Sequence, residues 1–198
     1  MKANNKKIAI LDIAEDLFCS YGSKNTTVRL ISKKAKISPA MLNYYFGSKG
    51  NLSLLIFERK IKQLKGRQKE LDLKNKTAIE QTLVYTNFYI DLIVEHLPFY
   101  RLMMKEKLLN ENEIIVNLID SYFKSNMETL RNVLNKGRNE KEIKQLNNDS
   151  FVMIVSGLLA NIIFKTDNVQ DVLYHKNVKQ IKKQLHEVLV VLFVITLK

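Results

Sequence analysis

The sequence has little of what secreted, disulfide-bonded or disordered proteins depend on. Its 198 residues include one cysteine (Cys19), two prolines and six glycines. A single cysteine cannot form an internal disulfide, which fits a reducing cytoplasm. Because 46% of the residues are hydrophobic and so few are Gly or Pro, the chain falls outside the disordered and low-complexity classes and can bury a real core.

No apolar run is long enough to cross a bilayer. The longest, Val188–Ile195, has eight residues, whereas a membrane-spanning helix needs about 20. Residues 1–7 are polar and basic, so we expect no secretory signal. The chain is therefore expected to be soluble and cytoplasmic.

The net charge of +12 is concentrated in the first third of the chain. Residues 1–75 hold 16 basic and 6 acidic residues, a net charge of +10, while residues 76–198 hold 16 and 14, a net charge of +2. A basic module attached to a near-neutral body suits a polyanionic partner, with nucleic acid first and an anionic membrane surface second. From charge alone, a merely soluble basic protein is an equally good interpretation.

Apolar spacing predicts an all-α chain, with no lasting alternation of the kind that favours strands. Ile10, Ile13, Ala14, Leu17 and Tyr21 follow helical spacing, and Gly22 marks a stop. The expected helices cover residues 5–21, 27–35, 39–46, 48–75, 77–96, 98–109, 112–137, 149–165 and 176–197. Short helices at the N-terminus and longer ones after them indicate a small bundle followed by a larger one.

Residues 27–46 have the pattern of a helix-turn-helix. Ser38 is placed to cap the second short helix, and Pro39 falls at its first position, where a missing N–H is harmless. Ile37, Leu42 and Phe46 would pack inward. The outward positions carry aromatic and amide groups without any acid, between basic segments at 33–36 and Lys49. In such a motif the second helix enters the major groove, and flanking groups meet phosphates.

The same residues carry a resemblance. The segments TTVRLI (26–31), SPAMLNYYF (38–46) and GSKGNL (47–52), with IAEDLF (13–18) and YG (21–22) upstream, resemble the DNA-binding domain of the tetracycline-repressor (TetR/AcrR) family. The resemblance covers about residues 5–60. It implies a helix-turn-helix DNA-binding domain over 1–48 and an effector-binding and dimerisation domain over 49–198.

By position, the resemblance implies a set of DNA-contacting residues. Thr27, Tyr45 and Lys49 would face phosphates, Arg29 would lie at the groove edge, and a recognition surface would be formed by Ser38, Pro39, Ala40, Met41, Asn43 and Tyr44.

Two positions depart from the family pattern. Lys36 stands in the turn where the family usually has Gly, and a positive φ there would cost about 1 kcal/mol, although its ammonium could reach a phosphate. Asn43 stands where Tyr is frequent, and its amide could pair with adenine or reach a phosphate.

In the family, the C-terminal bundle binds a small molecule. Aromatic and Met side chains suggest an apolar effector pocket, with ordinary helix core as the alternative for any one of them. The candidates are Phe88, Tyr89, Phe99, Tyr100, Met103, Tyr122, Phe123 and Phe151.

The last two expected helices favour a two-fold dimer. Small residues would let helices approach closely, and a segment that is apolar all round must be covered. The expected interface contains Ser156, Gly157, Ala160, Val188, Leu192 and Ile195. Membrane anchoring by residues 188–195 is the alternative.

No catalytic constellation is present. His96, His175 and His186 are isolated, and neither a Cys pair nor a Gly-rich phosphate loop occurs. We therefore expect no enzyme activity, cofactor or metal. The sequence favours a dimeric regulator with a double-stranded DNA operator and no membrane partner. The resemblance implies that it responds to an unknown small-molecule effector and favours a repressor over an activator. The alternatives are a basic helical module on anionic lipid and a protein-binding scaffold.

Overall fold

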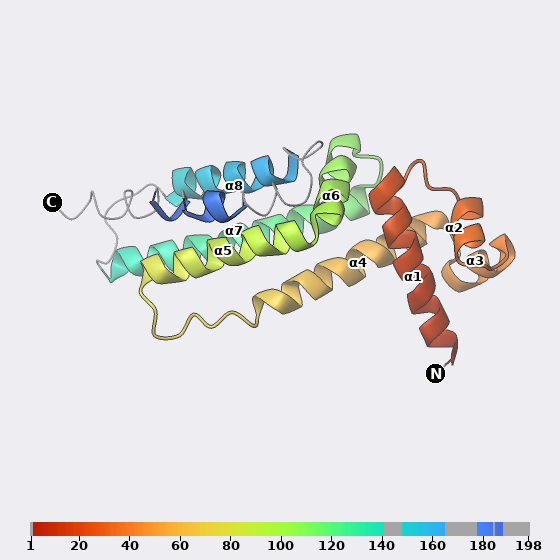
Figure 1. Cartoon of the computed structure of the whole chain (residues 1–198), viewed down its shortest axis with the longest axis horizontal. Helices are drawn as coiled ribbons and strands as arrows, with labels where there is room; N and C mark the ends of the chain where they lie inside the picture. Colours follow the sequence, from red (N-terminus) through yellow and green to blue (C-terminus); the bar gives the residue numbers. More distant parts are fainter. Residues whose placement is uncertain (1, 141–147, 165–177, 184, 188–198) are drawn as a thin grey trace. The chain divides into compact units, whose positions relative to one another are not determined.

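The computed structural model describes residues 2–140, 148–164, 178–183 and 185–187. Every regular element in these ranges is an α-helix (Figure 1), which confirms the expected fold class. The labelled helices are α1 (Lys2–Tyr21), α2 (Val28–Lys34), α3 (Pro39–Phe46), α4 (Lys49–Gln68), α5 (Ala78–Glu95), α6 (Leu97–Leu109), α7 (Glu113–Asn139) and α8 (Asn148–Phe164). Residues 178–183 and 185–187 are also helical.

The chain divides into two compact units that interleave along the sequence. The first contains Met1–Arg67 and Pro98–Tyr122, and the second contains Gln68–Leu97 and Phe123–Lys198. Helix α6 and the start of α7 thus pack with α1–α4 rather than with α5 and α8. The expected boundary after residue 48 concerns function rather than packing, and it stays a prediction.

The core of the first unit lies between α1, α4 and α6. Ala14, Leu17 and Phe18 of α1 are buried at helical spacing, and Phe57 of α4 packs against Phe99 of α6 with ring centroids 5.3 Å apart. Tyr21 ends the same apolar pattern but is 54% exposed, because α1 stops there and Gly22 turns the chain away with φ +81°.

Charged side chains fasten α1 to α4 beside this core. Arg59 pairs with Asp12 at 2.7 Å and with Glu15 at 2.8 Å, while Lys60 reaches Glu15 at 3.0 Å. Burial alone would lower the pKa of the Arg59 guanidinium, but the hydrogen bonds to Glu15 and Asp12 outweigh it and raise this pKa. A cavity of about 400 Å³ is lined by these residues together with Asp16 and Gln63.

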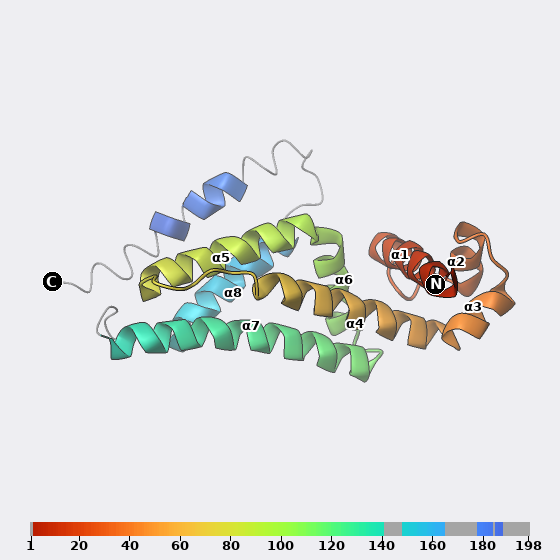
Figure 2. The ribbon, with the colours of Figure 1, turned by 90° about the horizontal axis from the view of Figure 1, so that it is seen from below.

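The second unit is held by α5, the later part of α7 and α8 (Figure 2). Tyr85 of α5 donates a hydrogen bond of 2.7 Å to the carbonyl oxygen of Asn126 on α7. Ser156 of α8 lies 3.0 Å from the Met127 sulfur of α7, and Lys182 pairs with Asp91 of α5. These contacts leave one side of α8 uncovered, as described below.

One expected helix is shorter than the sequence predicts. The helix expected over 48–75 ends at Gln68, and α5 begins after Thr77. The connection between them has its own turn chemistry, because Asn75 takes a left-handed φ of 55° and Asp72 accepts from the Lys74 backbone N–H. Thr77 then starts α5 with a capping box, in which hydrogen bonds from Thr77 lower the pKa of Glu80.

No helix among the described residues is long and apolar enough to span a bilayer.

The largely buried thiol of Cys19 gives a test of the α1 packing. Burial, followed by the negative charge of Glu15, raises the pKa of Cys19 to about 12. Since only the thiolate is nucleophilic, we expect iodoacetamide at pH 8 to alkylate the native protein at least about a hundredfold more slowly than the urea-unfolded chain. Mass spectrometry over time measures both rates, and equal rates would contradict the position of this thiol in the packed unit.

Candidate nucleic-acid interface

Two side-chain caps define the helix-turn-helix. Thr27 accepts a hydrogen bond of 3.1 Å from the Leu30 N–H at the start of α2, and Ser38 accepts one of 3.1 Å from the Met41 N–H at the start of α3. Pro39 occupies the first turn of α3. The predicted Ser38 cap and Pro39 position are therefore confirmed. Each cap gives an intramolecular partner to one N–H of the first turn that has none within the helix, in helices of only seven and eight residues.

The turn between α2 and α3 has the backbone conformation that favours glycine. Lys36 has a φ of 52°, and the chain reverses there so that the Ile37 N–H donates to the Ser32 carbonyl oxygen at 3.0 Å. The sequence raised this possibility from the glycine expected at that position, and the structure confirms the positive φ. The side chain of Lys36 is exposed.

Helix α3 has one buried side and one open side. Leu42 and Phe46 are 2% and 6% exposed, as predicted, and they fix the helix against its unit, while Ile37 before the cap is only half-buried. Tyr44 is 85% exposed. The other candidate recognition residues are exposed or half-buried: Ser38, Pro39, Ala40 and Asn43 are exposed, and Met41 and Tyr45 are half-buried.

Tyr45 is held from both sides. Its ring meets that of Tyr44 edge-on at 5.7 Å, and the Lys7 ammonium of α1 lies 5.9 Å from its centroid. A tyrosine placed in this way has its ring orientation fixed by neighbours on two helices. The contact between Lys7 and Tyr45 could not be predicted from the sequence, because the two residues are 38 positions apart and no sequence pattern relates them.

Basic residues precede and follow α3 in the chain. Arg29 and Thr27 on the α2 side are exposed, and Lys33 and Lys34 are exposed at the end of α2. Lys49 differs, since it begins α4 but is half-buried, and its ammonium donates to the carbonyl oxygen of Ser23 at 2.8 Å. The eleven candidate residues lie on or next to α2 and α3 or begin α4, within the first unit, and their roles toward DNA stay predictions.

The eight candidate effector residues divide between the two units. Phe99, Tyr100, Met103 and Tyr122 belong to the first unit, where the Tyr100 and Tyr122 hydroxyls lie 2.7 Å apart. Tyr89 and Phe151 are buried in the second unit, while Phe88 and Phe123 are half-buried there. All eight are packed side chains, so a pocket formed by them stays a prediction.

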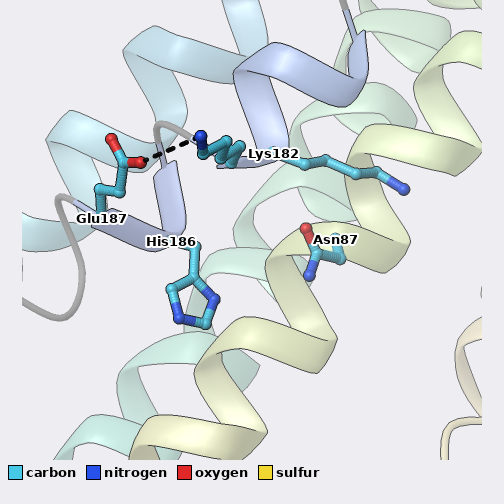
Figure 3. Close-up of a pocket in the computed structure, with 5 residues that line it drawn as sticks. Asn87, Lys182, His186 and Glu187 are labelled. Carbon is cyan, nitrogen blue, oxygen red and sulfur yellow. Dashed lines mark ion pairs between the residues drawn. The ribbon is translucent and has the colours of Figure 1, made fainter.

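A different set of residues surrounds a cavity in the second unit. It has a volume of about 450 Å³ and is lined by Asn87 of α5 with Lys182, Lys183, His186 and Glu187 (Figure 3). Lys183 and Glu187 form an ion pair at 3.9 Å. No pattern in the sequence indicates this cavity, because its walls come from segments about a hundred residues apart.

The candidate dimer residues are only partly described. Ser156 and Ala160 are half-buried and Gly157 is exposed, whereas Val188, Leu192 and Ile195 lie outside the described residues. Next to Gly157, α8 exposes Met153 (71%), Ile154 (52%) and Phe164 (57%). The described residues contain no group of three His, Cys, Asp or Glu side chains suited to a metal ion.

The left-handed turn residue gives a stability test. Replacing Lys36 by Gly (K36G) removes the clash between Cβ and backbone at positive φ, so the free energy of unfolding should rise by about 0.5–1 kcal/mol. Urea denaturation measures this change. K36A is the matched control, because it removes the same side chain but keeps Cβ. If K36G and K36A raised the free energy of unfolding equally, the gain would come from loss of the lysine side chain and not from relief of the backbone conformation.

Comparisons with known proteins support the geometry. Residues 10–54 match the family described as "Bacterial regulatory proteins, tetR family". HTH-type transcriptional regulator QacR of Staphylococcus aureus (strain Mu50 / ATCC 700699) is 31% identical over 126 residues, which are 60% of this chain and 67% of QacR. YttP of Bacillus subtilis (strain 168) is 23% identical over 180 residues, 88% of this chain and 84% of YttP.

Solved structures share the whole fold. A transcriptional regulator of the tetR family, PfmR from Thermus thermophilus, has a TM-score of 0.72 at 20% identity, covering 91% of this chain and 96% of PfmR. A family match that contains the capped α2–turn–α3 segment, and a relative that is matched over two thirds of its length, agree with the site built above. The chain belongs to the tetR family of bacterial transcriptional regulators.

Proposed function

We propose that this chain acts as a dimeric repressor that binds a pseudo-palindromic operator in the cytoplasm and releases it when a small molecule binds. The observation that carries the proposal is the open side of α3, where an 85% exposed tyrosine and an exposed amide extend from a helix that is capped and anchored. A single exposed aromatic is common on protein surfaces. The support comes from its place on a capped helix within a segment that carries six basic residues and no acidic one between residues 22 and 57.

In this proposal α3 lies in the major groove. Its N-terminal residues, Ser38 to Met41, face base edges, while Asn43 can pair with adenine through its amide and Tyr44 can contact bases or a thymine methyl group. Thr27, Tyr45 and Lys49 would contact phosphates, which set the register of the protein on the duplex. Arg29, which is exposed, would lie at the groove edge, and the exposed Lys36 could also reach a phosphate.

Dimerisation through α8 is supported by its exposed apolar side. Met153, Ile154 and Gly157 are exposed on two successive turns, and Phe164 is exposed two turns further along, after the exposed Asn161. In a monomer this largely apolar side of α8 would face water. A two-fold axis through this side would present two copies of α3 to half-sites about 34–36 Å apart or a multiple of that distance.

Effector binding is proposed for the body of the protein. A regulator from Saccharomonospora viridis with a similar fold (TM-score 0.75, 16% identity, covering 95% of this chain and 96% of that one) was crystallised with choline. Here, the eight aromatic and Met residues named above, four from each unit, remain the candidates. An effector that changes the separation of the two α3 helices would couple DNA and effector affinities reciprocally.

A substitution in the open side of α3 tests DNA recognition. Y44A should reduce the preference for operator over scrambled duplex by about 1–3 kcal/mol, since a base contact is lost while phosphate contacts remain. Fluorescence anisotropy on genomic fragments selected by the wild type measures both affinities. Y21A is the matched control, since it removes an exposed tyrosine from the end of α1. The proposal fails if the wild type binds all duplexes equally, or binds anionic vesicles instead.

A charge on the exposed side of α8 tests dimerisation. I154E would bury a carboxylate in the proposed interface, so sedimentation at micromolar concentration should change from dimer to monomer. I114E is the control, because Ile114 is 64% exposed on α7. A wild-type monomer, or dissociation by both variants alike, would refute the α8 interface.

A further inference from the structure

The turn between α1 and α2 is closed by its own hydrogen bonds. Gly22 takes a φ of +81°, and its N–H donates to the Phe18 carbonyl oxygen at 2.8 Å. Thr26 is fully buried, and its hydroxyl contacts the carbonyl oxygens of Gly22 at 2.9 Å and Leu17 at 3.1 Å. Residues 22–26 therefore form a defined structure that neighbouring elements can hold.

Helix α6 holds this turn from one side. The Ser23 hydroxyl donates a hydrogen bond to the Glu106 carboxylate, which is only 5% exposed. The Lys105 ammonium would lie 2.8 Å from a Cβ at Gly22, so this side chain of α6 follows the glycine backbone closely. One residue further along, Lys24 pairs with Glu111 at 2.8 Å, but both of these side chains are at least half exposed.

Lys49 holds the same turn from the other side. Its ammonium donates to the Ser23 carbonyl oxygen at 2.8 Å and lies 3.5 Å from that of Lys24. Lys49 is the first residue of α4 and follows α3 after Gly47 and Ser48. Because an ammonium has three protons, at least one remains available for a phosphate oxygen while the carbonyl contacts fix its position.

Ser23 therefore contacts both neighbours at once, with its side chain toward Glu106 and its carbonyl toward Lys49. All three residues belong to the same compact unit. We propose that Ser23 is a positioning residue for DNA binding, which transmits the position of α6, through Glu106, to the ammonium of Lys49. The proposal rests on the function proposed above, since Lys49 matters only if it contacts a phosphate.

Because Glu106 is buried, the Ser23–Glu106 hydrogen bond is expected to be stronger than the exposed Lys24–Glu111 ion pair. A buried carboxylate that loses its hydroxyl donor has no water to replace it, so α6 and Ser23 are expected to move together. The exposed Lys24–Glu111 pair contacts water on both sides, and such pairs contribute little. The two contacts come from adjacent residues of one turn, which supplies a matched control.

A double-mutant cycle on duplex affinity tests the proposal. We expect S23A to weaken operator binding on the order of fivefold. The plot of log affinity against log salt concentration should also become less steep in S23A, toward that of K49A, which lacks about one phosphate contact. In the K49A background, S23A should have no further effect on affinity, because both changes remove the same contact. S23T keeps a hydroxyl and should restore binding, while E111Q should bind as the wild type does.

Urea denaturation of the same proteins separates this role from a structural one. S23A should lower the free energy of unfolding equally with and without K49A, although its effect on DNA affinity disappears in K49A. Additive losses of affinity in S23A and K49A, or an equal loss in E111Q, would overturn the positioning role. If the wild type lacks operator preference, the proposed function fails first, and this inference fails with it. Should S23A not fold, E106Q enters the cycle in its place, with the same outcomes.

Discussion

The candidate recognition surface lies on a helix that is too short to be stable alone. Helix α3 has eight residues, and isolated helices below about 12–15 residues are marginal in water. Its conformation is therefore imposed by its surroundings: Ser38 caps one end, Gly47 closes the other with φ +75°, and Leu42 and Phe46 anchor the middle. Because these four positions supply the stability, the outward positions can carry any residue that suits a base sequence.

The sequence predicted those features of the site that depend on neighbours a few residues away. Thr27, Ser38 and Gly22 act on the backbone within four residues, and the buried pair Leu42 and Phe46 follows from helical spacing. The bounds of most helices were predicted for the same reason. The end of α4 was not, since the expected helix continued through residues 69–75, where side-chain and backbone contacts at Asp72 and Asn75 define a turn instead.

Contacts between distant residues could not be predicted. Lys49 was expected to extend toward phosphate, yet its ammonium is held by a carbonyl 26 residues earlier. Glu106 lies 83 residues from Ser23, and the walls of the cavity around Asn87 come from two ends of the second unit. Periodicity and capping describe one helix at a time, so they say which face is buried but not which residue meets it. The packing of α6 with α1–α4 is of this kind.

The charge of the capped segment has a consequence for how the protein binds duplexes of any sequence. Residues 22–57 include six lysine and arginine residues and no aspartate or glutamate, while Asp12 and Glu15 are neutralised locally by Arg59 and Lys60. Because this segment carries no acid of its own, none of its side chains repels a phosphate backbone, and its attraction to any duplex depends on counterion release. The attraction of this segment to duplexes of any sequence should therefore weaken as the ionic strength rises.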